Sequence, residues 1–207
     1  KNIYCTSYFK SLEIINKNKI KGYCSFIDIG LKKSSLSIFK ANQLLYINNT
    51  YVGGDHITKD ISKVLKYDYR KAEAEKFRFS KRKKSEDFLI DNKEDELLKK
   101  IINSRLEEII ELLFIDCPIT KNLTSESGIK LYFIGNGSKV LTDNLLSFGP
   151  EFNFINEMSI IEEYPRDCCD GVIKYFAKNQ EVHYQKQSLS IENKGFFEKL
   201  FDYFSGK

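Results

Sequence analysis

The sequence predicts an α/β (α+β) fold, in which helices flank a central mixed sheet and a smaller lobe is inserted. Residues 23–61 alternate short apolar runs with turns and then open an amphipathic segment, which indicates three strands followed by a helix. Residues 94–114 repeat apolar side chains with a helical period, and residues 130–134 form an apolar run before a Gly-rich loop. These runs supply a sheet and the helices that cover it.

The turns of residues 23–61 suggest a phosphate site. The first predicted strand ends in Asp28-Ile29-Gly30, and the third stops at Gly53-Gly54-Asp55, where Asp55 and Thr58 are suited to begin a helix. Two consecutive hairpins bring the first turn and the helix entrance to one end of the sheet, so we expect a ligand there to meet free backbone N–H groups. Asp28 could hold a metal-bound water beside a phosphate. The alternative is an ordinary antiparallel sheet with an aspartate and a glycine in a turn.

The composition is that of an ordinary soluble globular protein. The chain has 207 residues, 42% hydrophobic and 30% charged, enough for one substantial core or two small lobes. A formal net charge of +4 does not call for a nucleic-acid partner, and no window approaches the ~20 apolar residues of a membrane span. Five cysteines, spaced like neither a zinc motif nor a disulfide framework, favour a reducing cytosol and no metal site. The chain opens without a methionine, and we expect a piece of a longer protein.

The predicted elements divide the chain into four parts. The sheet-bearing half is expected over residues 1–61 and 115–178, beginning with a strand and helix over residues 3–15 that Thr6 or Ser7 would cap. A smaller, charge-rich outer half is expected over residues 62–114. Residues 179–194 are polar without a clear period and indicate a linker, and residues 195–207 indicate a separate amphipathic helix.

Two motifs outside the first turn could serve a nucleotide. The predicted helix 72–79 places Glu75 and Arg78 three residues apart, a pair that can hydrogen-bond a diol. The alternative is a surface ion pair, which is far commoner and contributes only ~0.3–0.5 kcal/mol. The strand 130–134 runs into Gly135-Asn136-Gly137-Ser138 and then a predicted helix that includes Leu141 and Leu145, so that a backbone could approach a nucleotide closely.

The last thirteen residues predict a helix that lies on a membrane surface. At about 100° per residue its large apolar side chains fall within an arc of roughly 160°, with the charged ones opposite. The alternative is that this tail folds back into the core. The apolar face consists of Phe196, Phe197, Leu200, Phe201, Tyr203 and Phe204, and the charged face of Glu198, Lys199 and Asp202.

Several of these motifs together resemble the actin-like ATPase superfamily, and within it the FtsA family of bacterial cell division. The resemblance covers nearly the whole chain but only the second half of the family protein, so the first lobe of a two-lobed cleft would be missing. The matching segments are Asp-Ile-Gly at 28–30, Tyr-Val-Gly-Gly-Asp-His-Ile-Thr-Lys-Asp-Ile at 51–61, Ala-Glu-Lys-Phe-Arg at 74–78, Ile-Asn-Ser-Arg-Leu-Glu-Glu-Ile at 102–109 and Phe-Ile-Gly-Asn-Gly-Ser at 133–138.

The resemblance implies a nucleotide site. It places Asp28 and Gly30 in a phosphate loop, Glu75 and Arg78 at the ribose, and Gly135, Asn136, Gly137 and Ser138 along the adenosine, and it implies ATP with Mg²⁺ in the complete protein. The loop departs from the family pattern, because Leu31-Lys32-Lys33-Ser34-Ser35 stands where further Gly, Thr and Asp are usual. Bulky side chains replace glycines there, and Lys32 or Lys33 could offset the loss by contacting phosphate.

The resemblance also implies an adaptor, at most a weak ATPase, rather than a dedicated enzyme. Such a protein binds the C-terminal peptide of FtsZ through residues 62–114, self-associates into filaments, and attaches to the cytoplasmic face of the membrane at the division septum. Arg105 is the best single FtsZ contact, because a guanidinium grips a carboxylate bidentately. The alternative for Arg105 is an ion pair with Glu108 or Glu111 on the same helix.

Two other functions within the superfamily stay open. One is a small-molecule kinase, for which no substrate-pocket signature is present. The other is a pilus-assembly or plasmid-partition scaffold that acts without ATP. Neither His56 nor His183 belongs to a catalytic arrangement. The Phe-rich tail separates these functions, since a soluble kinase has no use for it.

Overall fold

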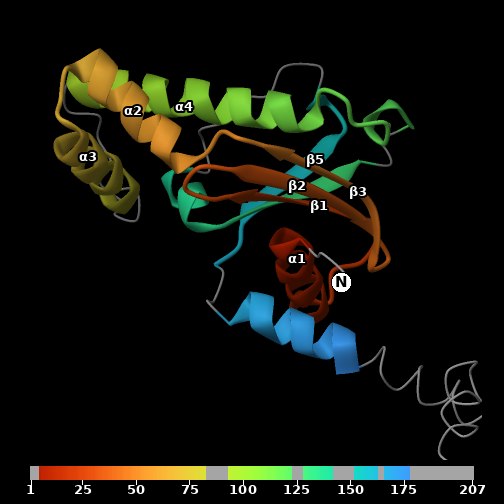
Figure 1. The fold of residues 1–207 in the computed structure, drawn as a ribbon. Coiled ribbons are helices and arrows are strands. Elements are labelled where there is room, and N and C mark those ends of the chain that lie inside the picture. Colours follow the sequence, from red (N-terminus) through yellow and green to blue (C-terminus); the bar gives the residue numbers. More distant parts are fainter. Residues whose placement is uncertain (1–4, 83–92, 123–127, 142–151, 163–165, 178–207) are drawn as a thin grey trace, which may run out of the picture. The chain divides into compact units, whose positions relative to one another are not determined.

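The computed structural model describes residues 5–82, 93–122, 128–141, 152–162 and 166–177 (Figure 1). The chain divides into two compact units, residues 1–168 and 169–207. The first unit holds a mixed sheet with the helices that pack on it. In the second unit the described residues are helical.

Five strands form the sheet in the order β3-β2-β1-β4-β5 (Figure 1). The first three strands pair antiparallel through tight turns, whereas β4 and β5 continue the sheet parallel to β1. The apolar runs that predict strands after residue 22 correspond to these five, so the mixed sheet is confirmed. The strand expected within residues 3–15 is wrong over the described residues, which are helical from Thr6. The strands are β1 (Tyr23–Ile29), β2 (Ser34–Lys40), β3 (Gln43–Thr50), β4 (Ile129–Ile134) and β5 (Ile155–Ile160).

Helices cover both faces of the sheet (Figure 1). They are α1 (Thr6–Asn18), α2 (Gly54–Leu65), α3 (Tyr69–Arg82), α4 (Lys93–Phe114) and the short 3-10 helices η1 (Thr120–Asn122) and η2 (Asn136–Val140). Residues 167–177 form a further helix.

Alternation along β1 separates two apolar clusters. Ile27 and Ile29 belong to the larger cluster, which α2, α3 and α4 complete. Cys24 and Phe26 belong to a smaller cluster on the opposite face, which α1 completes with two isoleucines. Because side chains of a strand alternate between faces, Asp28 continues the row of Cys24 and Phe26 and lies on the α1 face at the strand end.

The long helix α4 confirms the strongest periodic signal in the sequence. It begins at Lys93, and three acidic residues occupy its first turn, where the helix dipole favours negative charge. Its inward residues Leu98, Ile102, Leu106 and Leu113 are fully or almost fully buried. The helix predicted over residues 72–79 is longer than expected, since α3 extends from residue 69 to residue 82.

Three local predictions are corrected. Neither Thr6 nor Ser7 caps α1, because the helix begins at Thr6 and its N-cap residue is Cys5, without a side-chain cap hydrogen bond. The cap of α2 is Gly53, so Asp55 and Thr58 lie inside the helix. The Gly-rich loop leads into the 3-10 helix η2, whereas Leu145 lies outside the described residues.

Candidate functional site

The C-terminal end of β1 brings together most of the predicted phosphate-site residues. Asp28 closes the strand on the α1 face, and one of its carboxylate oxygens, Oδ2, accepts a hydrogen bond from Lys10 Nζ at 3.1 Å. The other, Oδ1, lies against Gly135, where an added Cβ would come within 2.4 Å of it. The strand end, α1 and the Gly135–Ser138 segment therefore meet at this carboxylate.

The turn after Asp28 is closed on itself and on α2. Gly30 N–H donates to Lys33 O at 2.9 Å, which makes a tight turn over residues 30–33. The N–H groups of Gly54 and Asp55 donate to the carbonyls of Gly30 and Leu31, at 2.9 and 2.7 Å. The prediction that a ligand meets free N–H groups at this helix entrance is therefore wrong for these two amides. The orphan donors of the first helical turn hold the loop instead.

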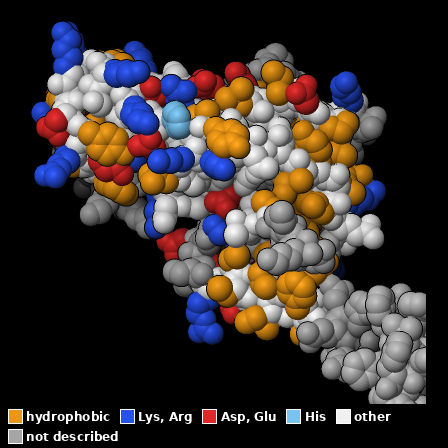
Figure 2. All heavy atoms as spheres, viewed as in Figure 1, with side chains coloured by type: hydrophobic (Ala, Val, Ile, Leu, Met, Phe, Trp, Pro, Cys, Tyr) orange, Lys and Arg blue, Asp and Glu red, His pale blue; other side chains and the backbone are white. Residues whose placement is uncertain are grey.

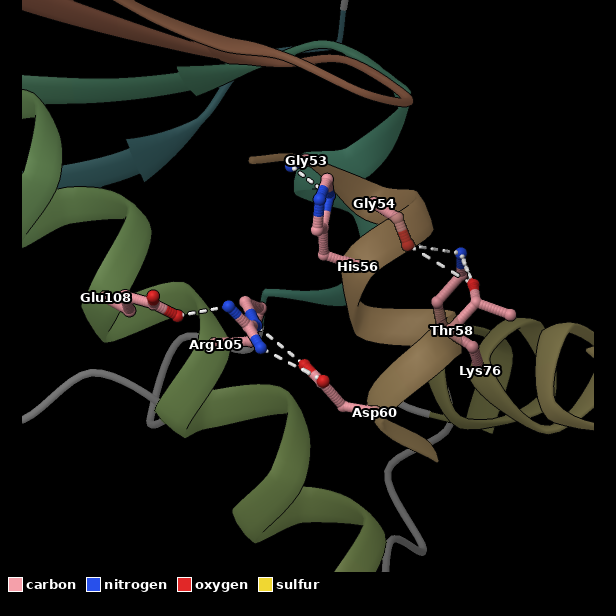
Figure 3. Close-up of polar contacts among 8 residues, drawn as sticks. All are labelled: Gly53, Gly54, His56, Thr58, Asp60, Lys76, Arg105 and Glu108. Atoms are coloured by element: carbon pink, nitrogen blue, oxygen red, sulfur yellow. Dashed lines mark hydrogen bonds and ion pairs between the residues drawn. The ribbon is translucent and has the colours of Figure 1, made fainter. Parts of the chain in front are cut away.

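Gly53 lets the 30–33 turn pack against the start of α2, because a residue with a side chain would not fit there. A Cβ on Gly53 would lie 2.7 Å from Gly30 O and 2.9 Å from both Leu31 O and Lys33 N. Its own N–H donates to His56 Nδ1 at 3.2 Å, and His56 N–H donates back to Gly53 O at 3.0 Å (Figure 3). The loop and the helix entrance thus form one hydrogen-bonded unit.

The Gly135–Ser138 segment packs directly on the end of β1. Gly135 has a φ of +86°, a conformation that side chains disfavour. A Cβ on Gly137 would come within 2.4 Å of Ile29 Cγ2 and 2.7 Å of Ile29 O. Ser138 closes the η2 turn, since its hydroxyl and its N–H both donate to Gly135 O. Both glycines therefore fill positions where the backbone approaches β1 closely, whereas a close approach to a nucleotide stays a prediction.

A buried lysine that the sequence analysis missed connects α3 to this corner. Lys76 is 5% exposed, and its ammonium donates to Gly54 O at 3.1 Å, to Thr58 Oγ1 at 2.7 Å and to Glu73 Oε2 at 2.7 Å (Figure 3). Its three donors are therefore engaged, as a buried charge requires. The spacing of Lys76 four residues after Ala72 on the buried stripe of α3 was the available signal.

Two further contacts that the sequence analysis missed involve Asp55, in the first turn of α2. Its carboxylate accepts hydrogen bonds from Lys59 Nζ at 2.6 Å and from the Tyr69 hydroxyl at 2.7 Å. The hydrogen bonds from Lys59 and Tyr69 lower the pKa of Asp55 below its usual value. The same hydrogen bond, together with burial, raises the pKa of Tyr69 to about 12.

The predicted ribose pair lies on α3 and is engaged within the chain. Arg78 Nε donates to Glu75 Oε2, and Arg78 Nη2 donates to Asp95 Oδ1 of α4 at 3.0 Å. The surface ion-pair interpretation is thus realised, and a diol would have to compete with it. Ser80 Oγ donates to Lys139 O at 2.6 Å, so α3 also contacts η2. Lys32 is exposed in the loop.

Arg105 clamps α4 to α2. Its Nε and Nη2 donate to Asp60 Oδ2 and Oδ1 at 2.6 and 3.0 Å, a bidentate pair, and its Nη1 donates to Glu108 (Figure 3). The hydrogen bond to Asp60 raises the pKa of Arg105. The expected intrahelical pair with Glu108 is therefore present, and the longer-range pair with Asp60 was missed. Contact with FtsZ stays a prediction.

The Asp28 carboxylate, the candidate Mg²⁺ ligand of this corner, is paired with Lys10. Magnesium sites use one or two carboxylates together with substrate phosphates, so Asp28 is the ligand that matters here. One oxygen of Asp28 accepts a hydrogen bond from the Lys10 ammonium, and the other lies beside Gly135 at a place that an added Cβ would fill. Within the described residues there is also no cluster of three or more His, Cys, Asp or Glu side chains that could hold a metal.

The predicted tail residues Phe196, Phe197, Leu200, Phe201 and Phe204 lie outside the described residues. So does the linker 179–194. No helix in the described segments is long and apolar enough to span a membrane.

Comparison with known proteins identifies the family. The family model for cell division protein FtsA matches residues 25–186. No curated protein sequence matches the chain. Apo ParM of pSK41 superposes with a TM-score of 0.55 at 14% identity, covering 85% of this chain and 50% of that one. MreB5 of Spiroplasma citri bound to AMPPNP superposes with a TM-score of 0.55 at 16% identity, covering 88% and 60%.

A third structure, the Alp12 filament, has a TM-score of 0.51 at 14% identity and covers 83% of this chain and 53% of that one. At such identities the likeness concerns the fold alone, which is that of an actin-like ATPase domain. The chain spans about half the length of the solved structures that it matches.

Proposed function

The chain belongs to the FtsA family, and from that membership we propose that it forms part of an actin-like adaptor that tethers FtsZ filaments to the cytoplasmic face of the membrane at the division septum. The family match over residues 25–186 is the observation that carries the proposal. The five-stranded sheet with helices on both faces supports it, because it is the actin-like scaffold on which such an adaptor is built.

We further propose that the corner formed by Asp28, Gly30 and Gly135–Ser138 faces a nucleotide. The role is supported by the meeting of Asp28, the 30–33 turn and the Gly135–Ser138 segment at one end of the sheet. One lobe supplies only part of the contacts of a cleft between two. We therefore expect this chain alone to bind ATP weakly or not at all, because losing ~3–4 kcal/mol moves a micromolar dissociation constant toward millimolar. Calorimetry that gave low-micromolar binding would contradict this expectation.

The surface proposed for FtsZ is basic and partly apolar, as an acidic tail peptide requires. Figure 2 shows lysine and arginine side chains gathered where α2 and α3 lie. Apolar groups stand among them, since Val64 is 52% and Tyr69 44% exposed. Such a surface attracts an acidic peptide and gives it something to bury. The exposed basic residues between the end of α2 and the start of α3 are Lys63, Lys66, Arg70 and Lys71.

The test measures binding of a fluorescent FtsZ C-terminal peptide to the chain by anisotropy. Reversal of two charges in Lys66→Glu/Arg70→Glu should weaken binding by about tenfold or more, and the loss should shrink at high salt because exposed charges are screened. Wild-type protein that ignores the peptide would remove the FtsZ-tethering role.

Arg105 needs a matched control because it also joins two helices. Arg105→Ala removes the guanidinium. Asp60→Asn weakens the same contact between α2 and α4 but keeps the guanidinium. If Arg105 contacts the peptide, only Arg105→Ala weakens binding. Equal losses in both variants assign Arg105 to the clamp and move the FtsZ contact elsewhere on residues 62–114.

The membrane role of residues 195–207 is a proposal that rests on the amphipathic pattern of that segment. Each tail should bind weakly, so attachment should depend on several tails in a self-associated filament. Co-sedimentation with liposomes should be lost on deletion of residues 195–207 or with Phe201→Glu, and should vary little with salt. An intact, artificially dimerised protein that stays in the supernatant would contradict the proposal.

A further inference from the structure

The ion pair between α1 and β1 engages the carboxylate that was expected to hold a metal-bound water. Lys10 Nζ lies 3.1 Å from Asp28 Oδ2, and the two side chains are only 20% and 13% exposed. Lys10 stands one helical turn before Ile14 of the buried α1 stripe, so its position is set by the packing of α1 on the sheet. The pair belongs to the corner itself.

We propose that Lys10 takes the place of a divalent cation at Asp28, so that the phosphates of a nucleotide meet an ammonium group there instead of a metal ion. This inference rests on the proposed nucleotide-facing role of the corner and names the charge that serves it. Lys10 acts as a positioning and charge-supplying residue; no chemical step is assigned to it.

Electrostatics supports the exchange of one cation for another. A lysine ammonium at hydrogen-bonding distance satisfies the Asp28 carboxylate, and a divalent ion brought to the same oxygen would be repelled by that charge in a partly buried site. The second carboxylate oxygen lies beside Gly135, where only a residue without a Cβ leaves it room. A lysine also binds phosphate as a point charge, without the coordination geometry that Mg²⁺ demands.

The turn that follows Asp28 also carries positive charge. Lys32 and Lys33 follow Asp28 by four and five residues, and both are exposed. Lys33 Nζ lies 4.6 Å from the centre of the Tyr51 ring, a cation–π contact that holds it beside the turn. Lys32 and Lys33 therefore add exposed positive charge to the turn that follows Asp28.

The decisive experiment is independent of nucleotide binding. The ¹⁵N-labelled chain is titrated with Mn²⁺, and paramagnetic broadening is followed at the amides of Ile29, Gly30 and Gly135. Wild-type protein should show no selective broadening at these amides. Lys10→Met, which keeps the length of the side chain and removes its charge, should gain it, and Lys10→Met/Asp28→Asn should lose it again. Lys10→Arg, which keeps the charge, should behave like wild type.

Two results of that titration overturn the inference. One is selective broadening in wild-type protein as strong as in Lys10→Met, since the lysine would then yield to the metal. The other is a Lys10→Met protein that gains nothing while its spectrum shows an intact fold, since the lysine would then not be what excludes the ion.

A second arm measures ADP binding in Mg²⁺ and in EDTA. We expect affinities within about twofold of each other, because no metal joins Asp28 to phosphate, and about a tenfold loss in Lys10→Met. Binding that requires Mg²⁺ overturns the inference. If ADP binds in neither buffer, as half of a two-lobed cleft allows, the Mn²⁺ titration alone decides which cation Asp28 accepts.

Discussion

The two glycine corners at the end of β1 look alike in the sequence and work differently in the structure. At Gly53-Gly54 the backbone is extended at the cap, with a φ of −161°, and the helix amides donate to the carbonyls of the 30–33 turn. At Gly135 the backbone has a φ of +86°, and the segment leans on Asp28 and Ile29. At the first corner, backbone hydrogen bonds join the 30–33 turn to the start of α2. At the second corner, the glycine backbone packs closely on the end of β1.

The difference shows that a glycine followed by a helix start is not by itself an anion site. The amides of a first helical turn seek acceptors, and a neighbouring turn can supply them as well as a phosphate can. At the first corner the acceptors are Gly30 O and Leu31 O. The roles of the two corners can be separated by adding one methyl group at a time.

Gly135→Ala should have the largest effect on stability. The alanine would have to adopt a backbone conformation that is nearly restricted to glycine, and its Cβ would lie 2.6 Å from Ile29 O. Strain and overpacking together should lower the free energy of unfolding by roughly 3–5 kcal/mol. Gly22→Ala is the matched control, because Gly22 has a φ of +81° and nothing within 4 Å of an added Cβ. It should lose only ~1 kcal/mol.

Urea denaturation measures both variants. If the two lose the same stability, the packing of Gly135 on the strand end contributes nothing, and the second corner is a turn like any other. A clearly larger loss in Gly135→Ala than in Gly22→Ala assigns the difference to the contact with Ile29 and Asp28.

Gly53→Ala should come next, with a loss of about 1–3 kcal/mol from overpacking alone, because its extended φ suits any residue. The three atoms that an added Cβ would meet are all backbone, so little relief is available. Gly54→Ala is the control one residue along. Its nearest neighbours lie 3.6–3.9 Å away, so it should be neutral or stabilising by ~0.5–1 kcal/mol through a less flexible unfolded chain. Equal losses of stability at the two positions in urea unfolding would contradict the tight packing of Gly53 against the 30–33 turn.

Much of this fold follows from the sequence, because its periodic signals are strong. The strands of residues 23–50, the strand 129–134 and α4 stand where apolar period and turn chemistry place them. The candidate site is harder, since its polar contacts join residues far apart in the chain. Lys10 reaches Asp28 across 18 positions, and Arg105 reaches Asp60 across 45. Spacing can place Lys10 or Lys76 near a buried stripe, but their partners depend on how the helices pack.

The smallest expected effect on stability comes from the hydrogen bond between Tyr69 and Asp55, which also lies at the entrance of α2. The folded pKa of Asp55 is depressed, so its contribution is present above its unfolded value near 3.8 and is lost as the pH falls through the folded value. The folded pKa of Tyr69 is raised to about 12 from 10.0, so its contribution to stability is present below pH 10 and is lost as the pH rises toward 12.

Tyr69→Phe should therefore cost ~1 kcal/mol of stability between about pH 5 and pH 9, and less at both extremes. This is the net value of one hydrogen bond to a charged group that keeps its lysine partner. Unfolding in urea at pH 3, 7 and 11 measures this profile, with Tyr51→Phe as the control, since Tyr51 is 76% exposed and should give no loss at any pH. A loss in Tyr69→Phe that is the same at pH 7 and pH 11 would assign the residue to packing and remove its hydrogen bond to Asp55 from the helix entrance.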